Sequence, residues 1–149
     1  MAKVILEPIG EHHDQLLGDE VWKRNLSHMA GLNDELQAKR DEVRAGWGAK
    51  YEKRVRDKGK MPTWERLERL KDDDSPILPI GTLVNYGRTF GPDKRTSPGA
   101  GVVTAFLRVH GLWCVVIAND NTVASGSWWP QTPEKIQRAQ EIGLRMRLP

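Results

Sequence analysis

Apolar residues in the first half of the chain recur at steps close to three and four, the spacing of one face of an α-helix. This narrow stripe consists of Trp22, Leu26, Met29, Leu36, Val43 and Trp47. Asn33 and Arg40 interrupt the stripe, so we expect one amphipathic helix and not a free-standing coiled coil. Gly46 and Gly48 should end the helix, because each glycine weakens a helix by about 1 kcal/mol relative to alanine.

A second, shorter helix is predicted to begin at Met61-Pro62-Thr63. Leu67 and Leu70 fall on one side of this helix, and charged residues occupy the other side. The helix has to end before Pro76, because the proline ring and the missing N–H do not allow a helix to continue.

Residues 102–109 and 112–118 are two apolar runs separated by His110-Gly111, a pattern typical of a β-hairpin. We expect His110 to lie in the turn with a positive φ, which is a structural role and not a catalytic one. The second run is apolar at successive positions, which favours a strand covered on both faces. Cys114 lies within that run and is expected to be an inert core residue.

The last part of the chain predicts a further short strand and a helix. The strand-like segment follows Asn119 and ends at Trp128-Trp129-Pro130. Thr132 is expected to cap the helix, with Pro133 at its first position, because both residue types are favoured there. The residues that would face inward are Ile136, Ala139 and Ile142.

Composition places the chain among ordinary globular proteins, with 149 residues, 38% of them hydrophobic and 29% charged. Most of the charged residues precede Pro76, so we expect a mostly helical packing segment over residues 1–75 and a strand-rich part over 76–149. No apolar run approaches the ~18 residues of a membrane-spanning helix, which argues against direct membrane insertion. One cysteine and no visible targeting signal lead us to expect a cytoplasmic protein.

Basic residues are concentrated between Lys50 and Lys60, with Trp47 and Tyr51 close by. Basic residues interleaved with aromatic ones are typical of an arm that binds nucleic acid. Acidic residues recur inside this stretch, however, and a solvated helix of mixed charge is the commoner explanation. We therefore expect no nucleic-acid partner.

Three short motifs resemble a dinucleotide loop, a phosphate loop and a metal site, and each lacks a feature that such a site needs. Gly99-Ala100-Gly101 precedes a strand and does not open a helix, as a dinucleotide loop would. Residues 87–94 have the glycines and the lysine of a phosphate loop but not its ending. His12-His13-Asp14 offers metal-ligating atoms on adjacent, diverging side chains, so we expect an exposed polar segment and no metal.

Three longer segments together resemble a known family. They are residues 56–70 with Asp74-Ser75-Pro76, residues 99–104 with Arg108-Val109-His110-Gly111, and residues 118–130 with the helix that follows to Pro149. These segments are similar to those of the carboxyltransferase (β-type) subunits of biotin-dependent acyl-CoA carboxylases. The branch that contains methylcrotonyl-CoA carboxylase and glutaconyl-CoA decarboxylase is the most similar, over residues 46–149.

The resemblance implies an α+β fold that forms the N-terminal part of a crotonase-like ββα superhelix, preceded by peripheral helices. Family members exchange a carboxylate between carboxybiotin and an acyl-CoA, and backbone N–H groups stabilise the oxyanions. The turns that supply those N–H groups would follow Pro149, so we expect no catalytic residue in this chain and no activity from it alone.

The same resemblance implies the cofactors and partners. Biotin would arrive on a partner, the biotin carboxyl carrier or biotin carboxylase subunit; the acyl-CoA thioester would be the substrate, and the full-length protein would form a homo-oligomer. The other interpretation of the chain is a non-catalytic interaction module whose N-terminal amphipathic helix docks on a partner.

A CoA site is expected at the start of the last helix. Lys135 and Arg138 are three positions apart and would lie on about the same face, next to the positive end of the helix dipole. Gly126 and Ser127 would allow the backbone to approach the ligand, as the family resemblance suggests. The other interpretation is that both basic residues are solvated surface charges and that Trp128-Trp129 is core.

Overall fold

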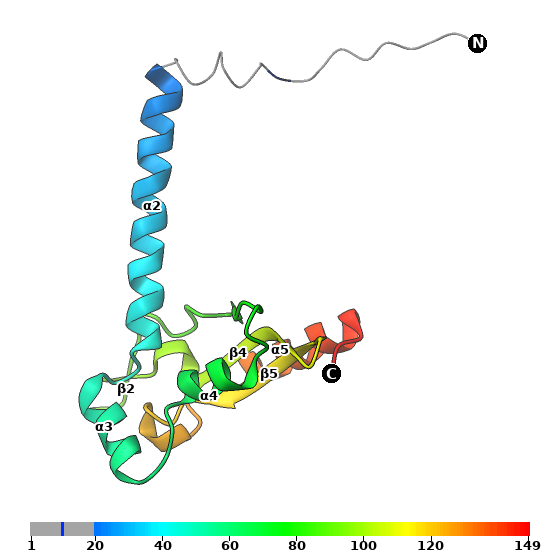
Figure 1. The fold of residues 1–149 in the computed structure, drawn as a ribbon. Helices are drawn as coiled ribbons and strands as arrows, with labels where there is room; N and C mark the ends of the chain where they lie inside the picture. Colours follow the sequence, from blue (N-terminus) through cyan, green and yellow to red (C-terminus); the bar gives the residue numbers. More distant parts are fainter. Residues whose placement is uncertain (1–9, 11–19) are drawn as a thin grey trace. The chain divides into compact units, whose positions relative to one another are not determined.

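The computed structural model describes residue 10 and residues 20–149 of the chain (Figure 1). Two compact units are present, residues 1–38 and residues 39–149. In the first unit the described structure is the larger part of helix α2, which spans Glu20–Arg44. The second unit holds the last residues of α2 and every other helix and strand described below, so residues 39–75 belong to the same unit as residues 76–149.

The predicted amphipathic helix is confirmed as α2, and of its apolar stripe only Val43 is buried. The turn after α2 contains Gly46 at a φ of 57°, a left-handed conformation that glycine adopts without strain. A Cβ added at Gly46 would overlap the Thr122 hydroxyl oxygen. Both the backbone conformation and the close approach of Thr122 therefore require glycine at this position.

Helices α3 (Ala49–Asp57) and α4 (Thr63–Leu70) follow. The predicted helix at Pro62-Thr63 is confirmed, with Pro62 at the N-cap position. Leu67 and Leu70 are three positions apart in α4, as expected for one side of a helix, but Leu67 is buried in the core whereas Leu70 is exposed. Leu70 occupies the last position of α4, where the chain turns away toward the sheet.

The main sheet has three antiparallel strands in the order β1-β4-β5: β1 is Leu78–Ile80, β4 is Val102–Val109 and β5 is Leu112–Asn119. The predicted hairpin is confirmed, with Val109 opposite Leu112 and His110 in the turn at a φ of 49°. β1 pairs with the other edge of β4 through Leu78 and Phe106. β4 is thus the central strand of the sheet.

Burial differs between the two strands of the hairpin. β4 carries the fully buried Leu107, whereas β5 is only half-buried and Leu112 is 69% exposed. The expectation that residues 112–118 are covered on both faces is therefore wrong for the described structure. β5 is an edge strand, and β4 is its only partner among the described strands.

A two-stranded ribbon and a tight turn lead into β4. Strands β2 (Thr89–Phe90) and β3 (Arg95–Thr96) are antiparallel and form a separate small sheet. The 3₁₀ turn η1 (Pro98–Gly101) follows directly. Gly99, Ala100 and Gly101 all have φ values near +60°, an unusual run that the surrounding structure has to hold in place.

Helix α5 (Thr132–Met146) packs on β4, β5 and η1. The strand expected between Asn119 and Trp128 is wrong, because this segment forms the 3₁₀ turn η2 (Ala124–Gly126) and irregular backbone. Three consecutive residues of η2 have positive φ, and strand pairing does not accommodate that conformation.

The hydrophobic core of the second unit lies between α4 and the hairpin. It consists of Leu67, Val103 and Leu107, with Trp64, Ile77, Val109, Cys114, Val116 and Ala118 packed around them. Burial raises the pKa of the Cys114 thiol, which agrees with an unreactive core residue. Within the described residues, no helix is both long and apolar enough to cross a membrane.

Candidate functional site

The entrance of α5 is built on two hydrogen bonds of Thr132. Its hydroxyl donates to the Ala100 carbonyl oxygen at 2.6 Å and accepts from the Trp129 N–H at 2.8 Å. Thr132 is the first residue of the helix, and Gln131, with a φ of 70°, is the N-cap. The expected cap is therefore shifted by one residue, because the Thr132 hydroxyl is used to bind η1 and the loop before the helix.

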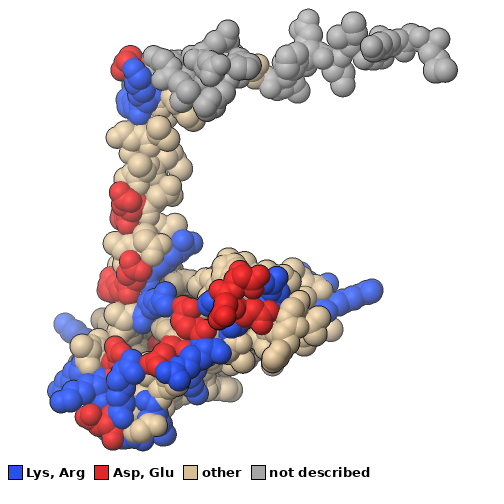
Figure 2. All heavy atoms as spheres, viewed as in Figure 1, with Lys and Arg blue, Asp and Glu red and all other residues tan. Residues whose placement is uncertain are grey.

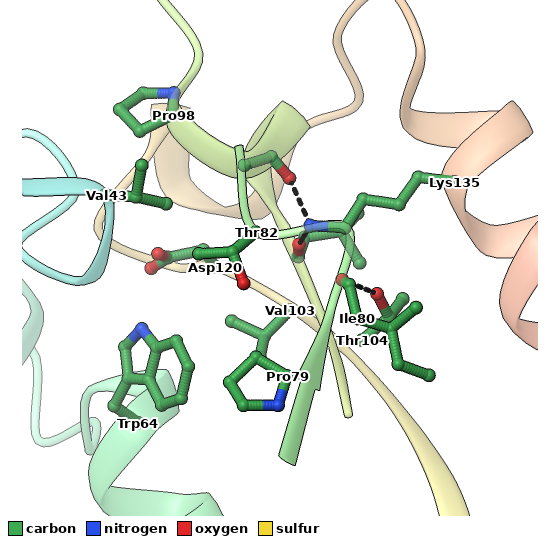
Figure 3. Close-up of a pocket in the computed structure, with 12 residues that line it drawn as sticks. Val43, Trp64, Pro79, Ile80, Thr82, Pro98, Val103, Thr104, Asp120 and Lys135 are labelled. Atoms are coloured by element: carbon green, nitrogen blue, oxygen red, sulfur yellow. Dashed lines mark hydrogen bonds between the residues drawn. The ribbon is translucent and has the colours of Figure 1, made fainter. Parts of the chain in front are cut away.

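Lys135 is buried, with 9% of the residue exposed, and its side chain reaches from α5 to the η1 turn (Figure 3). Its Nζ donates hydrogen bonds to the carbonyl oxygens of Gly99 at 2.8 Å and Val102 at 2.7 Å. Burial lowers the pKa of Lys135 to about 8, and the negative charge of Asp120 acts in the opposite direction. The ammonium group therefore holds η1 and the first residue of β4 against α5.

A small cavity of about 20 Å³ lies beside the Lys135 side chain. Trp64, Pro79, Val103 and Asp120 contribute to its wall, and Figure 3 shows the Trp64 indole nitrogen pointing toward the Asp120 side chain. This indole N–H is buried and has no partner within the described structure. The cavity has room for roughly one water molecule and is too small for an organic substrate.

The loop that contains Gly126 and Ser127 begins with left-handed residues. Ala124, Ser125 and Gly126 have φ values of 45°, 59° and 87°. The Ser127 hydroxyl donates to the Ala124 carbonyl oxygen at 2.9 Å and remains exposed. Left-handed conformations of non-glycine residues cost free energy and concentrate at functional loops, so this loop is a candidate for ligand contact.

Arg138 differs from Lys135 in its surroundings. Its side chain is exposed, and its guanidinium lies 3.6 Å from the Glu141 carboxylate. Lys135 and Arg138, which were expected on about the same face of α5, therefore differ in exposure, since Lys135 is buried and Arg138 faces solvent. Arg138 alone of the two presents a positive charge at the surface.

The two tryptophans before α5 have separate environments. Trp128 is 63% exposed, whereas Trp129 packs edge-on against Trp47 with ring centroids 6.0 Å apart and also contacts Phe90. Trp129 thereby joins the loop before α5 to the turn after α2 and to the β2–β3 ribbon.

No group of three or more His, Cys, Asp or Glu side chains that could hold a metal occurs among residues 20–149 and residue 10. The pair His12-His13 lies outside the described residues.

Residues 54–149 match the carboxyl transferase domain family. The chain is 40% identical over 121 residues to the biotin-dependent 3-methylcrotonyl-coenzyme A carboxylase beta1 subunit of Mycobacterium tuberculosis, covering 81% of this chain and 21% of that protein. It is 34% identical over 128 residues to the mitochondrial methylcrotonoyl-CoA carboxylase beta chain of Dictyostelium discoideum, covering 86% and 21%. The chain thus spans about a fifth of the length of these relatives.

Among solved structures, the transcarboxylase 12S hexamer with hydrolysed methylmalonyl-coenzyme A bound aligns with a TM-score of 0.71. The identity is 29%, over 79% of this chain and 23% of that chain. The solved carboxyltransferases have the crotonase-like fold, and the mixed helix and sheet arrangement described here agrees with it.

Proposed function

Because the chain belongs to the carboxyl transferase domain family, we propose that it is part of the acyl-CoA carboxyltransferase component of a biotin-dependent carboxylase or decarboxylase. This component would transfer carboxylate between carboxybiotin and an acyl-CoA. The observation that carries the proposal is the family match over residues 54–149, supported by 40% identity to a 3-methylcrotonyl-CoA carboxylase subunit.

The chain would contribute the CoA side of the site, with Gly126, Ser127 and Arg138 as residues that bind CoA and Lys135 as a residue that positions them. Arg138 is exposed and would pair with a phosphate, while the Gly126 backbone would lie close to the ligand. Lys135 would act indirectly, because its ammonium already binds two carbonyl oxygens. Its role would be to hold η1 against α5 so that the loop and helix keep their relative position.

Biotin would be delivered by a biotin carboxyl carrier or biotin carboxylase subunit, and the protein would act as a homo-oligomer. The aligned transcarboxylase 12S structure is a hexamer, which supports an oligomeric form for the complete component. The oxyanion-stabilising N–H groups would come from outside residues 20–149. A cytoplasmic location is part of this proposal, and a single cysteine in a half-buried position fits a reducing compartment.

Binding of 3-methylcrotonyl-CoA to the purified chain, measured by isothermal titration calorimetry, tests the proposal. We expect saturable binding that weakens several-fold on Arg138→Ala, because one charge-assisted contact is lost. Arg145→Ala is the matched control, since Arg145 is exposed near the other end of α5. A folded chain that shows no affinity for any acyl-CoA would contradict the proposal.

A non-catalytic interaction module is the second candidate, favoured by one observation. Trp22, Leu26 and Met29 of α2 are exposed apolar residues within the first unit. A monomeric chain that captures a protein partner through α2 and has no acyl-CoA affinity would support this candidate. Co-purification of a biotinylated protein would support the carboxyltransferase instead.

A further inference from the structure

The part of α2 that lies in the first unit has a face of exposed apolar side chains, which we call the α2 face. It consists of Trp22, Leu26, Met29, Leu32 and Leu36. The first four are exposed, with Leu26 at 55% and Met29 at 53%, and Leu36 is half-buried. Successive members are three or four positions apart, so they form one row along the helix. A row of exposed apolar side chains usually marks a surface that binds another protein.

The α2 face is symmetric about Met29. Leu26 and Leu32 lie three positions before and after Met29, and Trp22 and Leu36 lie seven positions before and after it. At a rise of about 1.5 Å per residue, the two members of each pair are equally far from Met29 along the helix axis. An antiparallel second copy that crosses at Met29 would therefore place an apolar residue opposite each apolar residue. A contact with two-fold symmetry requires such a self-complementary surface.

Charged residues follow the same symmetry with opposite signs. Lys23 and Arg24 lie six and five positions before Met29, Asp34 and Glu35 lie five and six positions after it, and all four are exposed. In an antiparallel pair the two cations of each copy are level with the two carboxylates of the other copy. In a parallel pair cations would be level with cations and carboxylates with carboxylates, which repel each other. The charges therefore favour an antiparallel pair.

Figure 2 shows how the charges are separated along α2. Acidic and basic groups at the start of the helix are followed by a stretch without charged residues and then by acidic side chains. The Lys23 ammonium lies 2.9 Å from the Glu20 carboxylate of the same helix, and both side chains are more than half exposed. An exposed ion pair of this kind contributes little to stability, so Lys23 can exchange Glu20 for a carboxylate of a second copy.

Two asparagines fit the same register. Asn25 and Asn33 lie four positions before and after Met29. In the antiparallel pair Asn25 of one copy is level with Asn33 of the other copy, and two amides can form hydrogen bonds with each other. A slip of four residues in either direction would instead place Asn33 opposite Met29 or Val21. Polar residues of this kind fix the register of paired helices.

We propose that the α2 face binds the α2 face of a second copy of this chain, with the two helices antiparallel and crossing at Met29. The contact spans residues 22–36 of both copies, because Arg40 interrupts the apolar row beyond Leu36. It is smaller than a standard protein interface, so we expect a dissociation constant in the micromolar range. The inference goes beyond the proposed function, since pairing through α2 does not require that the chain bind acyl-CoA.

Sedimentation equilibrium of the full chain at about 1–200 μM tests the pairing. We expect the apparent mass to rise with concentration. Met29→Glu places two carboxylates together at the crossing point and should weaken association by about tenfold or more. Ser27→Glu is the matched control, because it adds the same charge to the opposite face of α2. Circular dichroism should show the same helix content in both variants, since both side chains are exposed.

Charge reversal tests the electrostatic part of the contact. The variants K23E/R24E and D34K/E35K should each associate more weakly than the unchanged chain, because each brings like charges together in the antiparallel pair. A chain with all four substitutions restores opposite charges at every level. It should associate about as well as the unchanged chain.

Disulfide cross-linking tests the orientation directly. A mixture of N25C and N33C chains should form a disulfide between the two variants, because these positions are level in the antiparallel pair. Each variant alone should form few such links. Peptide mapping identifies the cysteines that are joined and distinguishes them from Cys114.

Three results would overturn the inference. The first is a chain that stays monomeric over the whole concentration range, and binding of a different protein by α2 of that monomer would favour the interaction module instead. The second is association that Met29→Glu and Ser27→Glu affect equally, which would place the contact on another surface. The third is N25C joined to N25C as readily as to N33C, which would contradict the antiparallel orientation. Acyl-CoA binding is measured separately, so each of these results leaves the proposed function untouched.

Discussion

The Lys135 ammonium donates a hydrogen bond of 2.8 Å to the backbone carbonyl oxygen of Gly99, a residue in the left-handed turn before the central strand. A second bond from the same nitrogen, at 2.7 Å, reaches the carbonyl oxygen of Val102, the first residue of β4. One side chain of α5 thus binds both η1 and the first residue of β4. A buried carbonyl group without a hydrogen-bond partner destabilises the folded state. Lys135 therefore stabilises the fold by donating to the carbonyl oxygens of Gly99 and Val102.

Lys135 should also make stability depend on pH. Its folded-state pKa of about 8 is below its ordinary value of 10.5, so the unfolded chain binds more protons between these two pH values. The contribution of Lys135 to the free energy of unfolding should therefore rise as pH increases from 8 to 10.5. Urea denaturation of the chain and of Lys135→Met at several pH values measures the difference. A difference that is constant across this interval would contradict the prediction.

Asp72 is predicted to hold the hairpin turn. Its carboxylate accepts hydrogen bonds from the N–H groups of His110 at 2.7 Å and Gly111 at 2.8 Å, and from Arg108. The Gly111 N–H is the largest cause of the lowered pKa of Asp72, so its stabilising contribution should be lost as pH falls through that pKa. Asp72→Asn should lower the urea midpoint and speed amide exchange at the turn.

The neighbouring Asp73 provides the control for Asp72. It is exposed, and Asp73→Asn should leave the urea midpoint and the acid sensitivity nearly unchanged. Equal effects of the two substitutions would show that general charge, and not the turn contacts, determines the acid response.

Gly46→Ala should destabilise the second unit by more than backbone strain alone. Alanine in the left-handed region costs about 1–2 kcal/mol, and overlap with the Thr122 side chain adds a further ~1–3 kcal/mol. Gly59→Ala isolates the first contribution, because Gly59 has a similar φ of 67° and open space around its Cα. The comparison is made by thermal unfolding, and similar losses in both variants would refute the close packing at Gly46.

Leu107→Ala should cost about 2–5 kcal/mol of unfolding free energy, because Leu107 is fully buried in the core. Leu112→Ala removes the same atoms from an exposed position on the partner strand and should cost much less. Chemical denaturation measures both values. Comparable losses would show that β5 is covered in solution, in disagreement with the structure.

The elements with a clear period were predictable from the sequence. α2, α4 and α5 follow the helical spacing of apolar residues, and the hairpin follows from two runs joined by His110-Gly111. β1 was missed because it has three residues and contains Pro79, so it carries no periodic signal. An apolar run also cannot distinguish a central strand from an edge strand, which is why the burial of β5 was overestimated.

The site was harder to predict because its contacts are distant in sequence. The carbonyl groups that bind Lys135 lie in η1, and no local pattern indicates that a lysine in α5 will be buried there. A groove lined by Tyr51, Arg54, Lys94 and Arg95 likewise joins α3 to the β2–β3 ribbon. Sequence reasoning identified Trp47, Tyr51 and the basic residues, but only the fold brings them onto one surface.

A chimera tests the central claim most directly. Residues 54–149 would replace the matching segment of the Mycobacterium tuberculosis 3-methylcrotonyl-CoA carboxylase subunit, and carboxylation of 3-methylcrotonyl-CoA would be measured with its biotin-carrying partner. The account predicts a folded chimera with measurable turnover, whose Michaelis constant for 3-methylcrotonyl-CoA rises several-fold on Arg138→Ala while the turnover number stays nearly the same, because a remote contact binds ground and transition states alike. A folded, assembled chimera without acyl-CoA carboxylation would contradict it.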